Sequence, residues 1–366
     1  MGFSVSFGRD TGFELSWNEV TGAIGDSVTV LPLVVAVAVL TDLSLAVMLV
    51  WFGVFQVVWG LHYGVPVSVE PMKAVAALVV AGGITTGELL VAGLLLAGVL
   101  LVVGRTGALE RFGRHIGSPV VRGVQLGVAL VLLWTGMDLA GGDLRLAAVA
   151  VGVAVAVTAV GYWNASALAV LLLGGVVAAL STGLPSPALP TTDGLVLFGP
   201  EDLTVPAVEA AVAQLAMTLG NAALATSVLL ADYFDRDVSA DQLTTSMGLM
   251  NLVAIPFGAL PMCHGSGGVA GKYAFGARTA GANVVLGLGY VLVALFAVGL
   301  VAAYPLSMLG AILTLVALQL GRTSLRKAEP DDYLLVVGVG VCGLVVNLGV
   351  AFVAGVALYT VRQYAG

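Results

Sequence analysis

Uninterrupted apolar runs, each about as long as a membrane-spanning helix, follow one another along almost the whole chain of 366 residues. The runs predict that the lipid bilayer is the solvent for nearly all of the protein. Only 10% of the residues are charged, against about 25% in an ordinary soluble domain. A soluble enzyme, a disordered chain and a coiled coil are thereby excluded. An outer-membrane barrel is also excluded, because its strands would alternate apolar and polar residues.

Glycine, proline and charged residues divide the runs into predicted spans. These cover 17–40, 43–61, 69–82, 86–104, 118–139, 145–161, 164–182, 206–231, 239–258, 264–276, 280–303, 304–321, 332–346 and 348–363. The spans at 69–82 and 264–276 are too short to cross about 30 Å of hydrocarbon as plain helices. Short, interrupted segments at matching positions of two halves are typical of the binding site of a transporter.

One ungapped shift of 195 residues aligns three separate segments of the two halves. The aligned pairs include Glu19 with Gln214, Asp26 with Asn221, Gln56 with Asn251 and Pro66 with Pro261. Each half has seven spans, an odd number, so the second copy would be inverted in the membrane. We therefore predict an all-α polytopic membrane protein, a 7+7 inverted repeat whose two short half-helices meet at mid-membrane. The expected units are the first repeat at 1–183, an outer proline-containing linker at 184–205 and the second repeat at 206–366.

Loop charge predicts the orientation of the chain. With the N-terminus inside, Arg145 falls outside and Lys73 is embedded, so 12 of the 14 basic residues, Lys272 among them, lie on the inner side. This distribution satisfies the positive-inside rule and places both termini in the cytoplasm. We expect the protein to lie in the plasma membrane. The net charge of −7 argues against nucleic-acid partners. The two cysteines form neither a disulfide framework nor a spaced metal set, so no metal or other cofactor is expected.

Two carboxylates stand inside the first predicted span. Glu19 and Asp26 are seven residues apart and share one face of a helix. Ionisable residues in apolar spans are costly and by default mark a pathway or a site. We expect Asp26 to face the centre of the bundle and assign both residues to proton coupling. The alternative is that Glu19 lies at the membrane interface and only Asp26 is buried.

The third span begins with an extended piece that runs into a helix. Pro66 and Pro71 disfavour helix just before them, and Ser68 is a candidate helix cap. The free N–H groups of the helix start then point into the protein, and Lys73 adds a full positive charge. Either Lys73 contacts a ligand directly, or Glu70 and Lys73 form an ion pair that merely neutralises itself.

The tenth span begins with a glycine-rich turn. Glycines expose consecutive N–H groups, and such a turn entering a helix can cradle an anion. The residues assigned to this cradle are His264, Gly265, Ser266, Gly267 and Gly268. Metal binding by Cys263 and His264 is disfavoured, because two adjacent ligands lack a second pair; an interior hydrogen bond is preferred for His264. Two helix N-termini favour an anionic substrate, and a nearby carboxylate would repel it unless protonated or paired, which suggests proton coupling.

Several motifs resemble those of one known family. They lie at 22–26, 66–74, 214, 218–222, 248–251 and 261–279. The most specific is Pro-Met-Cys-His-Gly-Ser-Gly-Gly at 261–268, followed by Phe-Gly-Ala-Arg-Thr at 275–279. Together they resemble the molybdate transporter family, a branch of the sulfate permease superfamily, over essentially residues 17–363.

The resemblance implies a transporter rather than an enzyme. It implies molybdate uptake with sulfate as a competitor, a substrate held between the third and tenth spans, and Gln214 and Asn221 among the binding residues. It also implies a core of 17–104 plus 206–303 that slides against a gate of 118–182 plus 304–363, and a homodimer formed through the gates. The expected partners are the oxyanion, protons and the lipid bilayer.

The sequence is also compatible with other functions. A permease for sulfate or another oxyanion would use the same fold. A nucleobase permease would need a carboxylate on the tenth span to bind a ring N–H, and 265–272 contains none. An intramembrane enzyme would rest on Cys263 and His264 alone, without a full set of nucleophile, base and orienting group.

Overall fold

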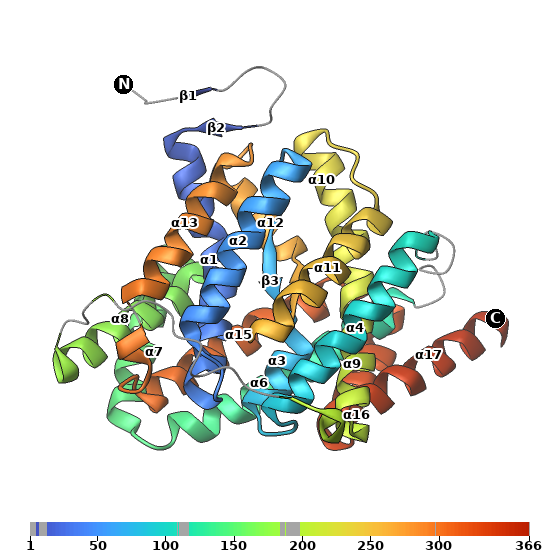
Figure 1. The fold of residues 1–366 in the computed structure, drawn as a ribbon. Coiled ribbons are helices and arrows are strands. Elements are labelled where there is room, and N and C mark those ends of the chain that lie inside the picture. The colour runs from blue at the N-terminus through green and yellow to red at the C-terminus, as the bar shows by residue number, and fades with distance from the viewer. Residues whose placement is uncertain are drawn as a thin grey trace.

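A computed structural model describes residues 5–6, 13–107, 109, 117–183, 187, 198–296 and 298–365. The described chain is mostly helical, and β3 lies near the centre with helices around it (Figure 1). The first part contains β1 (Val5–Ser6), β2 (Glu14–Leu15), α1 (Trp17–Leu40), α2 (Leu45–Tyr63), β3 (Val69–Pro71), α3 (Lys73–Val80), α4 (Thr86–Thr106), α6 (Ser118–Ala140), α7 (Leu144–Ala159), η2 (Trp163–Ala165) and α8 (Ser166–Thr182).

The second part begins after the linker. It contains η3 (Pro200–Asp202), α9 (Val205–Met217), the π-helix η4 (Thr218–Ala225), α10 (Thr226–Phe234), α11 (Ala240–Ala254), η5 (Ile255–Phe257), β4 (Met262–His264), α12 (Ser266–Ala274), α13 (Gly281–Phe296), α14 (Val298–Val301), α15 (Leu306–Arg326), η6 (Pro330–Asp332), α16 (Tyr333–Val345) and α17 (Leu348–Ala365). Most of the predicted linker at 184–205 lies outside the described residues.

Helices lie where the sequence predicts spans. Among the described residues, five are long and apolar enough to cross a membrane: Leu45–Tyr63, Thr86–Thr106, Ser118–Ala140, the continuous α9–η4–α10 helix and Leu306–Arg326. A sixth results if α1, which bends by 44° between Trp17–Val28 and Val30–Leu40, counts as one span. The other predicted spans are shorter or interrupted helices, so the number of 14 stays a prediction.

The two short predicted spans each consist of a strand followed by a short helix. β3 and β4 pair antiparallel, with Glu70 opposite Cys263, and both strands are fully buried. Pairing satisfies backbone groups that would otherwise be unpaired in the apolar interior. The extended piece expected before α3 is confirmed. The expected cap is wrong: Ser68 precedes β3, α3 begins after Met72, and the Ser68 hydroxyl donates to Asp26 Oδ1 at 2.6 Å instead.

Helix packing brings the two halves of the chain together around the strands. α2 packs on α13, α4 on α11, α1 on α12, α3 on α9 and α6 on α15. Gly53 and Gly287 mark a close crossing of α2 and α13, because a Cβ on either would stand 2.6–2.7 Å from the carbonyl oxygen of the other. Small residues of this kind let membrane helices approach closely.

Candidate functional site

Two carboxylates and two lysines meet where the two strands pair. Asp26 comes from α1, Glu70 from β3, Lys73 from the first turn of α3 and Lys272 from α12. Asp26, Glu70 and Lys272 have no exposed surface, whereas the Lys73 side chain is 20% exposed. The formal charges of the four groups cancel. We call them the charge cluster.

Glu70 lies against the N-terminus of α12. Its carboxylate forms an ion pair with Lys73, and its Oε1 accepts the Gly268 N–H at 2.6 Å. The Ser68 hydroxyl is 3.4 Å from the same oxygen. The ion pair of Glu70 with Lys73, one of the two alternatives that the sequence left open, is present, and the N-terminus of α12 is a third partner of Glu70.

Asp26 and Lys272 form the second pair, with Asp26 Oδ2 3.1 Å from Lys272 Nζ. Asp26 also accepts hydrogen bonds from Gln56 Nε2 at 2.8 Å and from the Ser68 hydroxyl. The Lys272 ammonium donates to Gln56 Oε1, the Val67 carbonyl and Asn283 Oδ1 at 2.7–3.0 Å. Asp26 is buried towards the bundle centre, as predicted. The assignment of Lys272 to the inner surface is wrong, because α12 starts in the interior and its seventh residue is still inside the protein.

Side chains of α9 and η4 reach both half-helices. Gln214 Oε1 accepts the Ala74 N–H in the first turn of α3 at 2.8 Å, and its Nε2 donates to the Thr218 hydroxyl. Asn221 Oδ1 accepts from the hydroxyl of Ser266, the first residue of α12, at 2.9 Å. η4 is a π-helix, a rare conformation that often occurs at functional sites.

Glycine is needed at two positions of the cradle. A Cβ on Gly265 would overlap the Glu70 carboxyl group, and one on Gly268 would overlap Asp26, Ser68 and Glu70. A Cβ on Gly267 would stand 3.9 Å from Glu70 Oε1, an ordinary contact. The backbone of α12 therefore approaches the charge cluster on one face only.

His264 is held in the packed interior beside the charge cluster. Its Nδ1 is 2.9 Å from the Ser68 carbonyl oxygen, and its Nε2 is 2.7 Å from the Ser246 hydroxyl, which accepts from Tyr63. The preferred reading of His264 as a hydrogen-bonded interior residue is confirmed. Within the described residues, three or more His, Cys, Asp or Glu side chains nowhere gather as metal ligands do.

Replacing Ser246 with alanine is expected to destabilise the fold by about 1–3 kcal/mol, because His264 Nε2 would lose its buried partner. The Tyr63 hydroxyl keeps a second acceptor, the Gln242 carbonyl, so the loss of its bond to Ser246 adds little to the destabilisation. Thermal unfolding in detergent measures the effect, with Ser181→Ala at an exposed helix end as control. Equal stability of the two variants would contradict the importance of this hydrogen bond.

Glu19 lies apart from the charge cluster. Its Oε1 accepts the N–H groups of Arg278 and Thr279 at 3.0 and 3.1 Å, and its Oε2 accepts that of Ala282 at 3.1 Å. The carboxylate thus satisfies backbone donors at the start of α13. Glu19 is only 2% exposed, so the expectation in the alternative that only Asp26 is buried is wrong.

A sequence model described as "Molybdate transporter of MFS superfamily" matches residues 18–132 and 206–320. The chain belongs to the molybdate transporter family. Molybdate transporters 2 and 1 of Arabidopsis thaliana are 28% and 29% identical to it, covering 93% and 94% of this chain and 86% and 87% of their own length. Molybdate transporter 1 of Chlamydomonas reinhardtii is 27% identical and covers 98% of this chain and 94% of its own.

Solved structures of other transporters share the fold of this family member. The transmembrane domain of the cyanobacterial bicarbonate transporter BicA superposes with a TM-score of 0.69 at 17% identity, covering 96% of this chain and 99% of its own. The murine anion transporter Slc26a9 in its inward-facing state gives 0.69 at 15%, covering 94% and 68%. The relatives are transporters rather than enzymes, and the expected family is confirmed. The chain is an integral membrane protein.

Sequence reasoning missed one member of this family member's charge cluster, Lys272, and two of its polar partners, Gln56 and Asn283. Lys272, Gln56 and Asn283 form one hydrogen-bonded group, in which Asn283 Nδ2 also binds the Val67 carbonyl at 2.6 Å. Charge balance was the available signal: two buried carboxylates need two cations, and Lys272 is the lysine on the tenth span.

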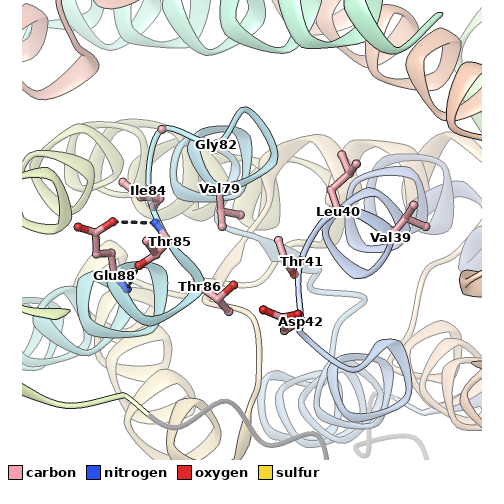
Figure 2. A pocket seen from close by; sticks show the side chains of 11 residues that line it. Val39, Leu40, Thr41, Asp42, Val79, Gly82, Ile84, Thr85, Thr86 and Glu88 are labelled. Atoms are coloured by element: carbon pink, nitrogen blue, oxygen red, sulfur yellow. Dashed lines mark hydrogen bonds between the residues drawn. The ribbon is translucent and has the colours of Figure 1, made fainter. Parts of the chain in front are cut away.

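A cavity of about 750 Å³ lies away from the charge cluster, at the far ends of α1 and α3 and the start of α4. Figure 2 shows Asp42 and Glu88 on its lining, with Glu88 accepting the Thr85 N–H in a helix cap. Its lining contains two carboxylates and no basic side chain, which does not suit an anion.

Proposed function

We propose that this protein imports molybdate by alternating access, with the oxyanion held between the N-termini of α3 and α12. The observation that carries the proposal is the pairing of β3 with β4, which brings two helix starts to one interior site beside Lys73. Helix N-termini offer N–H groups and positive dipole ends to an anion. Lys73 is the partly exposed cation of the charge cluster, so it is the one that can meet a substrate.

The other polar groups complete this proposed site. Ser266 and Asn221 border the start of α12, and Gln214 and Ser68 lie beside the start of α3 and β3. Their hydroxyl and amide groups supply hydrogen bonds of defined direction, as a tetrahedral oxyanion requires. The buried pair of Asp26 and Lys272 supports the site from behind and holds α1 against α12.

We further propose the 7+7 inverted repeat, and three observations support it. The family model matches two stretches of equal length, one in each half. The packing of α2 on α13 corresponds to that of α11 on α4 when the halves are exchanged, and α1 on α12 corresponds to α9 on α3. Gln56 binds the Val69 carbonyl of β3, and its repeat partner Asn251 binds the Met262 backbone of β4.

The moving parts in this proposal are the core, 17–104 plus 206–303, and the gate, 118–182 plus 304–363. The packing of α6 against α15, α16 and α17 supports the gate as one unit. We also propose that the protein lies in the plasma membrane. The concentration of basic residues in the predicted inner loops supports placing both termini in the cytoplasm.

Uptake of radiolabelled molybdate into proteoliposomes tests the function. Saturable uptake is expected, with unlabelled sulfate as the competing probe that ranks the two oxyanions. Ser266→Leu is expected to weaken molybdate binding at least tenfold, because leucine fills the start of α12 and removes the hydroxyl bonded to Asn221. Ser181→Leu, the same change at an exposed position, is the control. Unchanged affinity in Ser266→Leu would remove α12 from the site, and absent uptake by the wild type would refute the function.

A further inference from the structure

An anion that belongs to the protein already occupies the N-terminus of α12. The Glu70 carboxylate accepts the Gly268 N–H at 2.6 Å, pairs with Lys73 and has no exposed surface. Its carboxyl group fills the space beside Gly265 and Gly268, since a Cβ on either glycine would overlap it. The Gly268 N–H and the Lys73 ammonium are also the donors that the proposed function assigns to the substrate.

The substrate and Glu70 therefore exclude each other. The Gly268 N–H has one hydrogen to donate, and Glu70 Oε1 takes it. Charge adds to the conflict: the charge cluster sums to zero, so a dianion would bring two uncompensated negative charges into a buried site. Burying an unpaired charge costs free energy, and a buried carboxylate commonly avoids this cost by taking up a proton.

We propose that Glu70 is a built-in competitor for the oxyanion and the carrier of the coupled proton. The incoming oxyanion replaces the carboxylate at the Gly268 N–H and at Lys73, and Glu70 takes up one proton as it leaves them. Each oxyanion is thus accompanied by one proton, and release of both returns Glu70 to its place. This inference rests on the proposed function and assigns a role within the same site.

Glu70 fits this role better than Asp26. Asp26 is bound by Lys272, Gln56 and Ser68, and Lys272 is fully buried. Glu70 is bound through Lys73, whose side chain is 20% exposed, so its partners can be reached. The Ser68 hydroxyl, 3.4 Å from Glu70 and donating to Asp26, has lone pairs that can accept the proton of a neutral Glu70.

Several charged and titratable groups surround Glu70. From the elements packed against β3, the charged and titratable groups that interact with it are Lys73, Asp26, Lys272, Cys263 and Tyr290. Asp26 is paired with the fully buried Lys272, whereas Glu70 is paired with the partly exposed Lys73, so Glu70 is the group whose cation the substrate can take.

The test is proton uptake on molybdate binding to the purified, full-length protein in weakly buffered detergent solution, read with a pH-indicator dye. We expect one proton per molybdate bound by the wild type. The Kd should rise about tenfold per pH unit wherever one proton is linked to binding. Glu70→Gln is expected to bind molybdate without proton uptake and with a Kd independent of pH. Glu329→Gln, the same change at an exposed position, should behave as the wild type.

Each outcome bears on the proposal separately from the function. Wild-type binding without proton uptake, or unchanged uptake in Glu70→Gln, would overturn the role of Glu70 while leaving transport intact. No binding by the wild type would instead refute the proposed function. If Glu70→Gln does not fold, the role of Glu70 is tested by the same measurements on Glu70→Asp. Its shorter carboxylate withdraws from Gly268, so it should keep proton uptake yet bind molybdate more tightly, and equal or weaker binding would overturn the competition.

Discussion

Replacing Lys272 with methionine is expected to lower the free energy of unfolding by about 3–5 kcal/mol, because the Asp26 carboxylate would be left buried without its cation. Asp26 and Lys272 are both fully buried, 3.1 Å apart. Gln56 and Ser68 would still donate to Asp26 but carry no charge. Denaturant titration of the detergent-solubilised protein measures this loss of unfolding free energy.

The double variant Asp26→Asn with Lys272→Met is the matched rescue. It removes both charges and keeps an acceptor for Ser68 and Gln56, so it should recover most of the loss. Lys327→Met makes the same change at an exposed loop position and is expected to stay within about 0.5 kcal/mol of the wild type. A Lys272→Met protein as stable as the Lys327→Met protein would contradict the buried ion pair.

Replacing Gly268 with alanine is expected to abolish measurable molybdate binding. The added methyl group would overlap Asp26, Ser68 and Glu70, the space that the oxyanion must enter in the proposed site. Gly267→Ala is the neighbouring control, since its methyl group would meet Glu70 Oε1 at 3.9 Å. Alanine at either position favours the helix more than glycine does, so a difference between them reports on the site rather than on helix propensity.

Isothermal titration calorimetry with molybdate measures the affinities of the Gly267→Ala and Gly268→Ala variants. Binding should be near normal in Gly267→Ala and lost in Gly268→Ala. Equal affinities would show that the oxyanion does not approach this face of α12.

The sequence carried enough information to place most of the helices and the two interrupted segments. Continuous apolar runs define membrane helices because lipid imposes a minimum length on them. Pro66 and Pro71 predicted the extended piece before α3, because proline restricts the residue before it. The pair of Glu70 and Lys73 was accessible too, since three residues separate them and contact is local.

Features that depend on distant contacts were not accessible in the same way. Glu19 satisfies backbone donors 259–263 residues away, which no local pattern reveals. From the sequence, Lys272 was assigned to the inner surface. Its true depth depends on where β4 pairs with β3, and this long-range pairing cannot be read from local sequence. Ser68 looked like a helix cap, but strand pairing moved the helix start beyond it.

The most direct test of the central claim is the position of molybdenum in a crystal of the protein soaked with molybdate. Anomalous scattering at the molybdenum absorption edge identifies the metal of the oxyanion without reference to its surroundings. We expect one peak between the N-termini of α3 and α12, within hydrogen-bonding reach of Lys73 and the Gly268 N–H through its oxygens. A peak elsewhere in the protein, with this position empty, would contradict the account.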